Sequence, residues 1–381
     1  MNAVYLDHNA TTPLDPAVRD EMLPWLDPRP ANPSSLHAFG QHARRAVDQA
    51  RVRVARLIGA RPDEIIFTSG GTEADNLAIL GAAASNQSPT RLVTTAIEHQ
   101  AVLNPGLHIR RLGGSLTLAP VDAEGRLDPD TLLSSLPGDT TLVSVMLANN
   151  DVGTIQPVAA LAEPLHRRGV LLHTDAVQAA GKIPIDVEQL GVDLLSLSGH
   201  KLHGPQGSGA LYVRRNTRLS PILFGGHQER TIRPGTENVA AIAGFGKACE
   251  LARERLDADA AHMLALRTRF EQAILERIPG VTINGRGAPR LPNTTNLSFE
   301  GLDGELLVLN LDLLGIAAST GAACSSADRE PSHVLLAMGR TPAQARSSVR
   351  FSFGRDNRDE DVPRAVESVV RAVQRMREGR R

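Results

Sequence analysis

Short apolar runs alternate with amphipathic segments through the first two thirds of the chain. Each run is rich in Val, Leu, Ile or Thr, and most end in polar residues. The runs lie at 63–69, 91–99, 140–150, 169–176 and 192–200. Apolar runs separated by helical segments predict a mostly parallel β-sheet that helices cover on both faces. The first part of the chain is therefore predicted to be an α/β domain.

The pattern changes in the last third of the chain. A long helical stretch at 238–278 is predicted to join the first domain to a second one. The segments that follow it lie at 280–285, 294–301, 305–319 and 360–381. They predict a smaller α/β or α+β unit that closes with a helix. Two domains also agree with a length of 381 residues, which is long for a single core.

The composition indicates where the protein is located and which classes of binding partner are not expected. The formal net charge is −1, which gives no electrostatic reason to expect direct nucleic-acid binding or an anionic membrane. No apolar run has the length of a bilayer-spanning helix, and the N-terminus lacks a basic and then apolar signal region. Two cysteines cannot form a disulfide framework. We therefore expect a cytoplasmic protein without membrane association.

Lysine is scarce in this chain. Only Lys182, Lys201 and Lys247 occur among 41 basic residues, and the rest are arginine. Because arginine cannot lose its proton or form a Schiff base, a lysine kept against this background is a candidate amine. Lys201 follows an apolar run and stands beside His200, before a glycine-rich turn. Lys182 and Lys247 are interpreted as chance survivors at the surface.

Polar residues stand where the predicted strands end. In open α/β sheets, ligands bind at the carboxyl ends of the strands. The residues at these ends are Ser69, His99, Asn150, Asp175 and the segment 198–201. Asp175 is compatible with a helix cap, a metal ligand or a partner for a protonated ring nitrogen of pyridoxal phosphate. His200 and His203 could form a metal pair, but a matching set of Cys or acidic ligands is missing.

The segment 67–79 reads as a strand, a glycine turn and the start of a helix. Gly70 and Gly71 would let backbone amides approach an anion, and Thr72 adds a hydroxyl at the helix N-terminus. The spacing is not G-x-G-x-x-G, which argues against a dinucleotide. Thr72 could equally be a simple helix cap.

A lysine, an acid and a phosphate cradle are what pyridoxal phosphate requires, and here the chain resembles a known family. It is similar to class V aminotransferases, most closely to cysteine desulfurases of the NifS/IscS type. The matching segments run in order along nearly the whole chain: "YLDHNATTPLDP", "FTSGGTEADNLAI", "AIEHQAV", "NNDVGTIQP", "HTDAVQAAGKIPID", "SLSGHKLHGPQGSGALYVRR", "RPGTEN", "STGAACSSA" and "SVRFSFGR". The resemblance implies the fold type I of pyridoxal-phosphate enzymes. In that fold we expect a large cofactor-binding domain at 16–255 and a small domain formed by 1–15 and 256–381.

The resemblance also implies roles around the cofactor ring. Lys201 would form the Schiff base and later move the Cα proton of the substrate. Asp175 would keep the pyridine nitrogen protonated, and Gln178 would hydrogen-bond the phenolic oxygen. His99 would stack on the ring and assist proton transfer, although it could be an ordinary strand-end histidine.

Further residues would bind the phosphate and the substrate. The implied phosphate contacts are Gly71, Thr72, Ser198, His200 and, from the partner subunit of a homodimer, Thr236. Thr236 is also suited to cap the following helix. Asn150 would lie beside cofactor and substrate, and Arg350 would bind the substrate carboxylate through its planar guanidinium. A surface ion pair is the alternative for Arg350.

Cys324 stands among Gly, Ala and Ser, without the large apolar neighbours of a packing cysteine. It matches the cysteine of the family that accepts sulfur as a persulfide, which requires a thiolate near the substrate. Cys249, in a helical segment, is interpreted as a small core residue. The segment around Cys324 lacks the R-x-G-H-H-C pattern of the selenocysteine-lyase group, which favours ordinary cysteine as substrate.

We therefore expect a cysteine desulfurase that converts L-cysteine to L-alanine. Its persulfide sulfur would pass to an acceptor protein for iron–sulfur cluster assembly or tRNA thiolation. A transaminase or a sulfide-releasing β-lyase on the same fold would not need Cys324, and a non-catalytic subunit would not need the whole set of site residues. Asp151 stands where the family usually has Glu, and the chain ends early compared with relatives whose tail binds an iron–sulfur scaffold.

Overall fold

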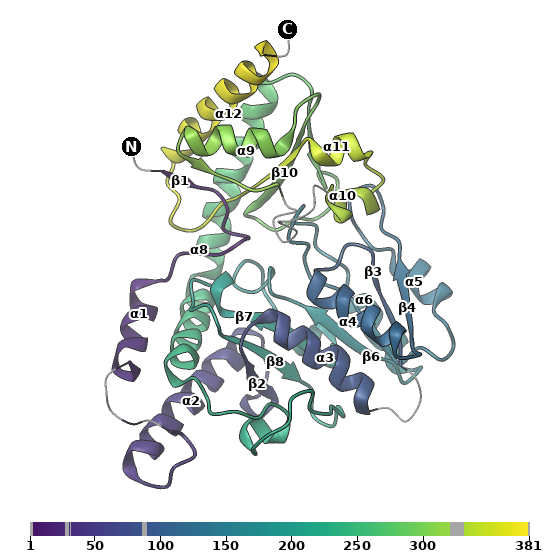
Figure 1. Ribbon diagram of the computed structural model, residues 1–381, viewed down its shortest axis with the longest axis vertical. Coiled ribbons are helices and arrows are strands. Elements are labelled where there is room, and N and C mark those ends of the chain that lie inside the picture. Colours follow the sequence, from purple (N-terminus) through teal and green to yellow (C-terminus); the bar gives the residue numbers. More distant parts are fainter. Residues whose placement is uncertain (1–2, 27–29, 31, 86–89, 321–330, 380–381) are drawn as a thin grey trace.

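The computed structural model describes residues 3–26, 30, 32–85, 90–320 and 331–379. Within these residues, the larger of the sheets has seven strands in the order β2-β8-β7-β6-β5-β3-β4 (Figure 1). Their bounds are β2 Ile65–Thr68, β3 Arg91–Thr95, β4 Ser115–Ala119, β5 Leu142–Ser144, β6 Leu171–Asp175, β7 Leu194–Ser198 and β8 Gly209–Val213. Strand β8 is antiparallel to β2 and β7, and the other neighbours are parallel. The predicted mostly parallel α/β sheet is confirmed.

Helices cover both faces of this sheet. Along β7, Leu194 packs with the helices of one face, whereas Leu195 and Leu197 belong to the core on the other. Strands buried on both faces carry apolar side chains on both, as these three leucines do. The helices of this part are α1 Pro16–Met22, α2 Ala38–Leu57, α3 Gly71–Ser85, α4 Gln100–Arg111, α5 Pro129–Ser135, α6 Ala159–His166 and α7 Val187–Leu190.

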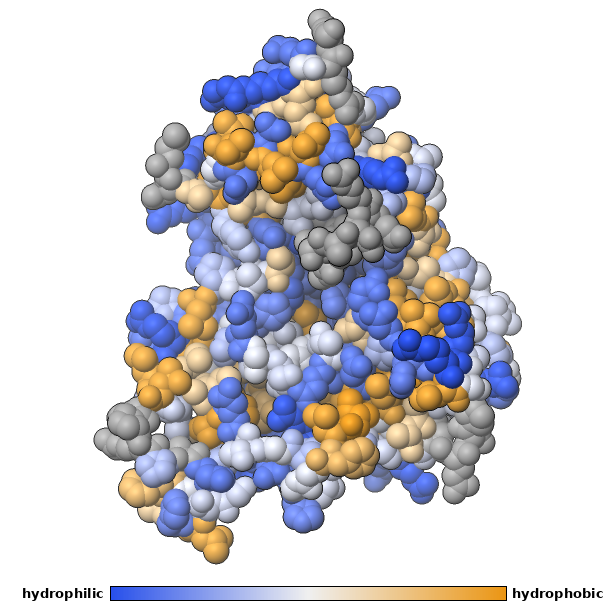
Figure 2. All heavy atoms as spheres, in the orientation of Figure 1, coloured by the Kyte–Doolittle hydropathy of each residue, from blue (hydrophilic) through white to orange (hydrophobic). Residues whose placement is uncertain are grey.

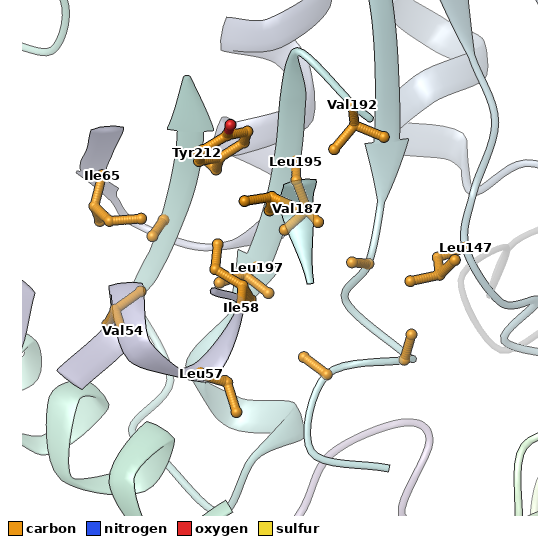
Figure 3. Close-up of a cluster of buried hydrophobic side chains, with 14 of the residues drawn as sticks. Val54, Leu57, Ile58, Ile65, Leu147, Val187, Val192, Leu195, Leu197 and Tyr212 are labelled. Atoms are coloured by element: carbon orange, nitrogen blue, oxygen red, sulfur yellow. The ribbon is translucent and has the colours of Figure 1, made fainter. Parts of the chain in front are cut away.

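The main core lies between the sheet and the helix α2. Val54, Leu57 and Ile58 from the end of α2 belong to one buried cluster with Leu197 of β7 and Tyr212 of β8 (Figure 3). Helices α3 and α4 cover the opposite face, packing on β3, β5, β7 and β8. The sheet is thereby fixed from both sides, and the ends of its strands are held in place to carry a site.

A second core surrounds a smaller sheet. Strand β10 (Thr294–Phe299) pairs antiparallel with β9 (Val281–Asn284) and β12 (Ser348–Ser352). Beside it, β1 (Val4–Tyr5) pairs parallel with β11 (Ile316–Ala317), which brings the N-terminus to this part of the fold (Figure 1). The remaining helices are α9 Gly304–Leu313, α10 His333–Ala337, α11 Pro342–Arg346 and α12 Asp361–Glu378.

The helix α8 (Val239–Arg277) runs through both parts (Figure 1). Phe245 near its start belongs to the main core, and Phe270 further along belongs to the second core, against Phe351. The long helical stretch thus joins the two parts as predicted from the sequence. The domain boundary at 255/256 stays a prediction.

The face shown in Figure 2 mixes hydrophilic and hydrophobic groups, and one of the hydrophobic groups lies over α9. Leu306, Leu309 and Leu313 of this helix are exposed. Within the described residues, no helix combines the length and the apolar character needed to cross a bilayer.

Candidate functional site

Three segments meet at the carboxyl ends of the central strands. Asp175 ends β6, and Ser198 ends the neighbouring strand β7. Gly71 begins α3, and a Cβ added there would lie 2.8 Å from Cγ2 of Val177 and 3.5 Å from Cβ of Ser198. Only glycine allows so close an approach. The predicted glycine turn therefore lies against both strand ends, as a phosphate cradle between them requires.

The carboxyl of Asp175 is buried beneath two basic side chains. Burial raises its pKa, whereas the electrostatic interactions with His99 and Lys201, and a hydrogen bond from N of Val177 (2.8 Å), act in the opposite direction. His99 and Lys201 must therefore lie close to this carboxyl, although they are far apart in sequence. An acid placed in this way can hold a proton on a ring nitrogen.

Lys201 and Gln178 meet at one backbone oxygen. Nζ of Lys201 donates to O of Asn9 (2.5 Å) and to O of Ala10 (2.7 Å). Nε2 of Gln178 donates to the same oxygen of Asn9 at 3.0 Å. The structure thus brings together the amine and the amide that the sequence analysis had singled out.

Asn9 itself was missed by the sequence analysis. It is buried, and its Nδ2 donates to O of Asn150 (3.1 Å) and to Oγ1 of Thr294 (2.9 Å). Its backbone N donates to Oγ of Ser352 (2.9 Å). It therefore connects the two parts of the fold at the site. The quoted segment "YLDHNATTPLDP" was the available signal, but no residue in it had been given a role.

Arg350 lies on β12, next to Asn150. Its Nη1 donates to O of Asn150 at 3.1 Å and its Nη2 to Oδ1 of Asp7 at 2.7 Å. The ion pair with Asp7 is buried on the arginine side, so the surface ion pair considered from the sequence is wrong. Nε of Arg350 is buried and has no hydrogen-bond partner among the described residues. One donor of the guanidinium thus remains for a ligand.

The residues expected to contact the phosphate differ in how deeply they are buried. Ser198 is buried, and Thr72 is exposed in the first turn of α3. Nδ1 of His200 lies 3.2 Å from Oγ1 of Thr11, and burial, with Lys201 and Lys182 nearby, lowers its pKa to about 4. A neutral imidazole at this position donates one hydrogen bond without adding charge.

His99 is the N-cap of α4. Its Nδ1 accepts a hydrogen bond from N of Ala101 at 3.1 Å. This bond fixes the ring orientation at the helix start and requires that Nδ1 carry no proton. The structural role of His99 is therefore that of a helix cap, and its stacking on the cofactor ring stays a prediction.

Two further sequence expectations need correction. The N-cap of α8 is Asn238, whose side chain accepts from N of Ala241, so the prediction that Thr236 caps this helix is wrong. Thr236 is exposed in the preceding loop, and no hydrogen bond within the described residues joins it to the site. Lys182 is buried rather than at the surface, and its Nζ donates to Gln178.

The structure describes only one of the two cysteines. Cys324 lies outside the described residues. Cys249 is fully buried in α8, and burial raises the pKa of its thiol, which confirms it as a core residue.

Comparisons with known proteins support the family resemblance that the sequence motifs indicated. The aminotransferase class-V family model matches residues 4–364. Cysteine desulfurase IscS of Dictyoglomus turgidum is 46% identical over 98% of this chain and 95% of its own length. A cysteine desulfurase of Gluconacetobacter diazotrophicus is 48% identical over 99% of this chain and 95% of its own length. Among solved structures, a NifS-like protein superimposes with a TM-score of 0.91 at 36% identity, covering 98% of this chain and 99% of its own. A structure of SspA in complex with cysteine superimposes with a TM-score of 0.83 at 35% identity, covering 92% of this chain and 99% of its own.

Proposed function

The chain belongs to the aminotransferase class-V family and, within it, to the cysteine desulfurases, and we propose that Lys201 holds pyridoxal 5'-phosphate and that Cys324 receives the sulfur. The observation that carries this proposal is the meeting of Lys201 and Gln178 at one backbone oxygen, close after the strand that Asp175 ends. An amine, an acid and a glycine turn at adjoining strand ends fit the aldehyde, the ring nitrogen and the phosphate of that cofactor.

The remaining residues fit the rest of the cofactor. Gly71 lets the start of α3, with its backbone amides, lie close to Ser198, and Thr72, Ser198 and His200 would supply further donors to an anion there. Nε2 of Gln178, already a donor to Asn9, also suits the phenolic oxygen. When bound, pyridoxal phosphate withdraws electrons from Cα of the substrate and so weakens its Cβ–S bond.

Arg350, Asn150 and Cys324 would act on L-cysteine. The unpartnered Nε of Arg350 suits the substrate carboxylate, and the neighbouring Asn150 orients it. Nζ of Lys201 takes the Cα proton, and His99 assists. The thiolate of Cys324 attacks the substrate sulfur, so that an S–S bond forms while the Cβ–S bond breaks. The electron pair of the broken bond goes to Cβ, which takes up a proton while Cα regains its own, so that alanine leaves and the sulfur remains on Cys324 as a persulfide.

We assign the persulfide to a sulfur-acceptor protein of iron–sulfur cluster assembly or of tRNA thiolation, in the cytoplasm. Two relatives carry the name IscS, which supports the first of these. A homodimer completes the proposal, since Thr236 would reach the phosphate of the partner subunit from its exposed loop. Gel filtration with light scattering tests the dimer, and an active monomer would contradict it.

The test of the function compares wild type with Cys324→Ala, each given L-cysteine. Alanine and protein-bound persulfide are measured, and Cys249→Ala is the control because this second cysteine is buried in α8. Wild type and the control should form both products. Cys324→Ala should keep its cofactor colour and form neither. If it makes alanine at the wild-type rate, sulfur leaves by another route and the β-lyase alternative replaces this proposal.

A second test concerns the lysine. Lys201→Ala should lose the visible absorption band of the bound cofactor, and Lys247→Ala should keep it. Lys247 pairs with Glu250 on α8 at 2.7 Å. A band that survives in Lys201→Ala and that borohydride bleaches would show that another lysine holds the cofactor.

A further inference from the structure

Lys182 is a buried amine next to the candidate site. It follows β6 by seven residues and is 5% exposed. Its Nζ donates to the backbone O of Gln178 at 2.9 Å and to Oε1 of the same residue at 3.2 Å. Within the described residues it has no ion pair. A buried lysine without a carboxylate partner is unusual and calls for a functional reason.

The groups around Lys182 are basic. Burial lowers the pKa of its amine to about 7, and the charges of Lys201 and Arg350 act in the same direction. The histidines His8, His200 and His203 also feel its charge. A guanidinium could not shed its charge in such a place, so a lysine is suited to this position in a chain that otherwise uses arginine.

Lys182 and Lys201 line the same small cavity, of about 30 Å³, beneath the site. A chain of hydrogen bonds also links them. It runs from Nζ of Lys182 to Oε1 of Gln178, and from Nε2 of Gln178 to O of Asn9, which accepts from Nζ of Lys201. Two of the three lysines of the protein are therefore connected through one carboxamide and one carbonyl.

We propose that Lys182 is a positioning residue that fixes the orientation of the Gln178 carboxamide. Both partners of its Nζ are oxygens that cannot donate, so the amine, charged or neutral, donates to the oxygen end of the amide and turns the nitrogen end toward Asn9. The phenolic oxygen of pyridoxal phosphate requires a donor, which is the end that Lys182 leaves facing the site. The inference rests on the proposed function, because that function makes Gln178 a cofactor contact.

The experiment uses the holoenzyme and the variants Lys182→Met, Gln178→Ala and their combination. Lys182→Met keeps the length of the side chain but removes the donor. The visible absorption maximum of the bound cofactor should shift in Lys182→Met and in Gln178→Ala. The double variant should shift no further than Gln178→Ala alone, since Lys182 acts through Gln178. Displacing a positioning group in this way should lower kcat/KM by up to about 100-fold.

Lys247→Met is the matched control, because it removes an amine at a half-buried position in α8. Its absorption maximum should equal that of wild type. If the folded Lys182→Met holoenzyme has the wild-type maximum, or if its shift adds to that of Gln178→Ala, the inference is overturned. A wild-type protein without any cofactor band would instead overturn the proposed function, and this inference with it.

Lys182→Met could fail to fold, because it leaves the carbonyl of Gln178 without its donor. Lys182→Gln then replaces it in the same comparison, since a glutamine amide keeps one donor but is too short to hold both acceptors. A shift of the same sign is expected in Lys182→Gln, and an unchanged maximum overturns the inference. If neither variant folds, Lys182 serves the fold alone, and the inference is equally overturned.

Discussion

The backbone carbonyl of Asn9 accepts a hydrogen bond from Nζ of Lys201 at 2.5 Å, across 192 residues of sequence. The side chain of Asn9 is at the same time bound to Asn150 and Thr294, one from each part of the fold. The position of the lysine amine is therefore set by an N-terminal segment that crosses from the small sheet to the large one. A change that moves this segment should disturb the site from a distance.

Gly354→Ala is such a change. A Cβ at position 354 would lie 2.1 Å from Cε1 of His8, the residue before Asn9, so the ring has to move. Overpacking of this kind costs about 1–3 kcal/mol of the free energy of unfolding. Urea unfolding measures the loss, and the absorption of the bound cofactor should change with it. Gly138→Ala is the control, since nothing lies within 4 Å of a Cβ there. Equal stability of the two variants would contradict this account.

The α/β layers followed from local patterns that tertiary structure did not override, whereas the order of the strands was not predicted from the sequence. All five residues of β7 are buried, and its adjacent leucines at 194 and 195, which lie on opposite faces, already indicated a strand covered on both sides. The polar residues at the ends of β6 and β7 could be singled out for the same reason. Asp175 and Ser198 stand where the periodic pattern stops, and parallel strands bring such ends together.

Asn9 and Lys182 could not be assigned in this way. Asn9 binds Lys201 through its backbone carbonyl, which every residue has, so this contact cannot be inferred from the residue type. The burial of Lys182 is decided by the packing of segments remote in sequence, and its neighbours "AGKIPID" resemble those of a surface turn. The scarcity of lysine did point to it, but that observation was applied to Lys201 alone.

Glu98 makes the stability of the fold depend on pH. Burial raises the pKa of its carboxyl from 4.5 to about 8, and hydrogen bonds from Thr95 and N of Met146 offset only part of that rise. Between these two values the folded protein keeps a proton that the unfolded chain has released. Stability should therefore fall as pH rises from about 4.5 to about 8. Glu98→Gln should reduce this fall, and thermal unfolding at a series of pH values measures it.

The control for this experiment is Glu305→Gln on the exposed face of α9, which should leave the pH profile of wild type unchanged. Some dependence should remain in Glu98→Gln, because burial also raises the pKa values of Asp75 and Asp175. A Glu98→Gln profile as steep as that of wild type would show that Glu98 is charged in the folded protein.

Asp151, where the family usually has Glu, joins the two parts of the fold. Its Oδ1 accepts from Nδ2 of Asn296 at 2.8 Å, and its Oδ2 accepts from Oγ of Ser332 at 2.6 Å. Asp151→Ala leaves both buried donors without an acceptor, at about 1–3 kcal/mol for each. Ser332→Ala removes one of the two bonds and should destabilise less. Urea unfolding measures the loss of unfolding free energy in both variants. A larger loss in Ser332→Ala than in Asp151→Ala would contradict this prediction.

The last prediction concerns backbone strain before α8. Glu229, Arg230 and Thr231 follow one another with positive φ, and Thr231 has a φ of 66°. This conformation costs a β-branched residue about 1–2 kcal/mol, whereas glycine adopts it freely. Because Thr231 is exposed, Thr231→Gly loses little packing and should stabilise the protein by about 1 kcal/mol after the greater freedom of the unfolded chain is counted.

Asn216→Gly, at a φ of 69°, is the matched control and should gain less, since asparagine tolerates this region. Thermal unfolding ranks the two variants, and a Thr231→Gly protein that melts below wild type would show that its neighbours, rather than its own φ, fix this turn.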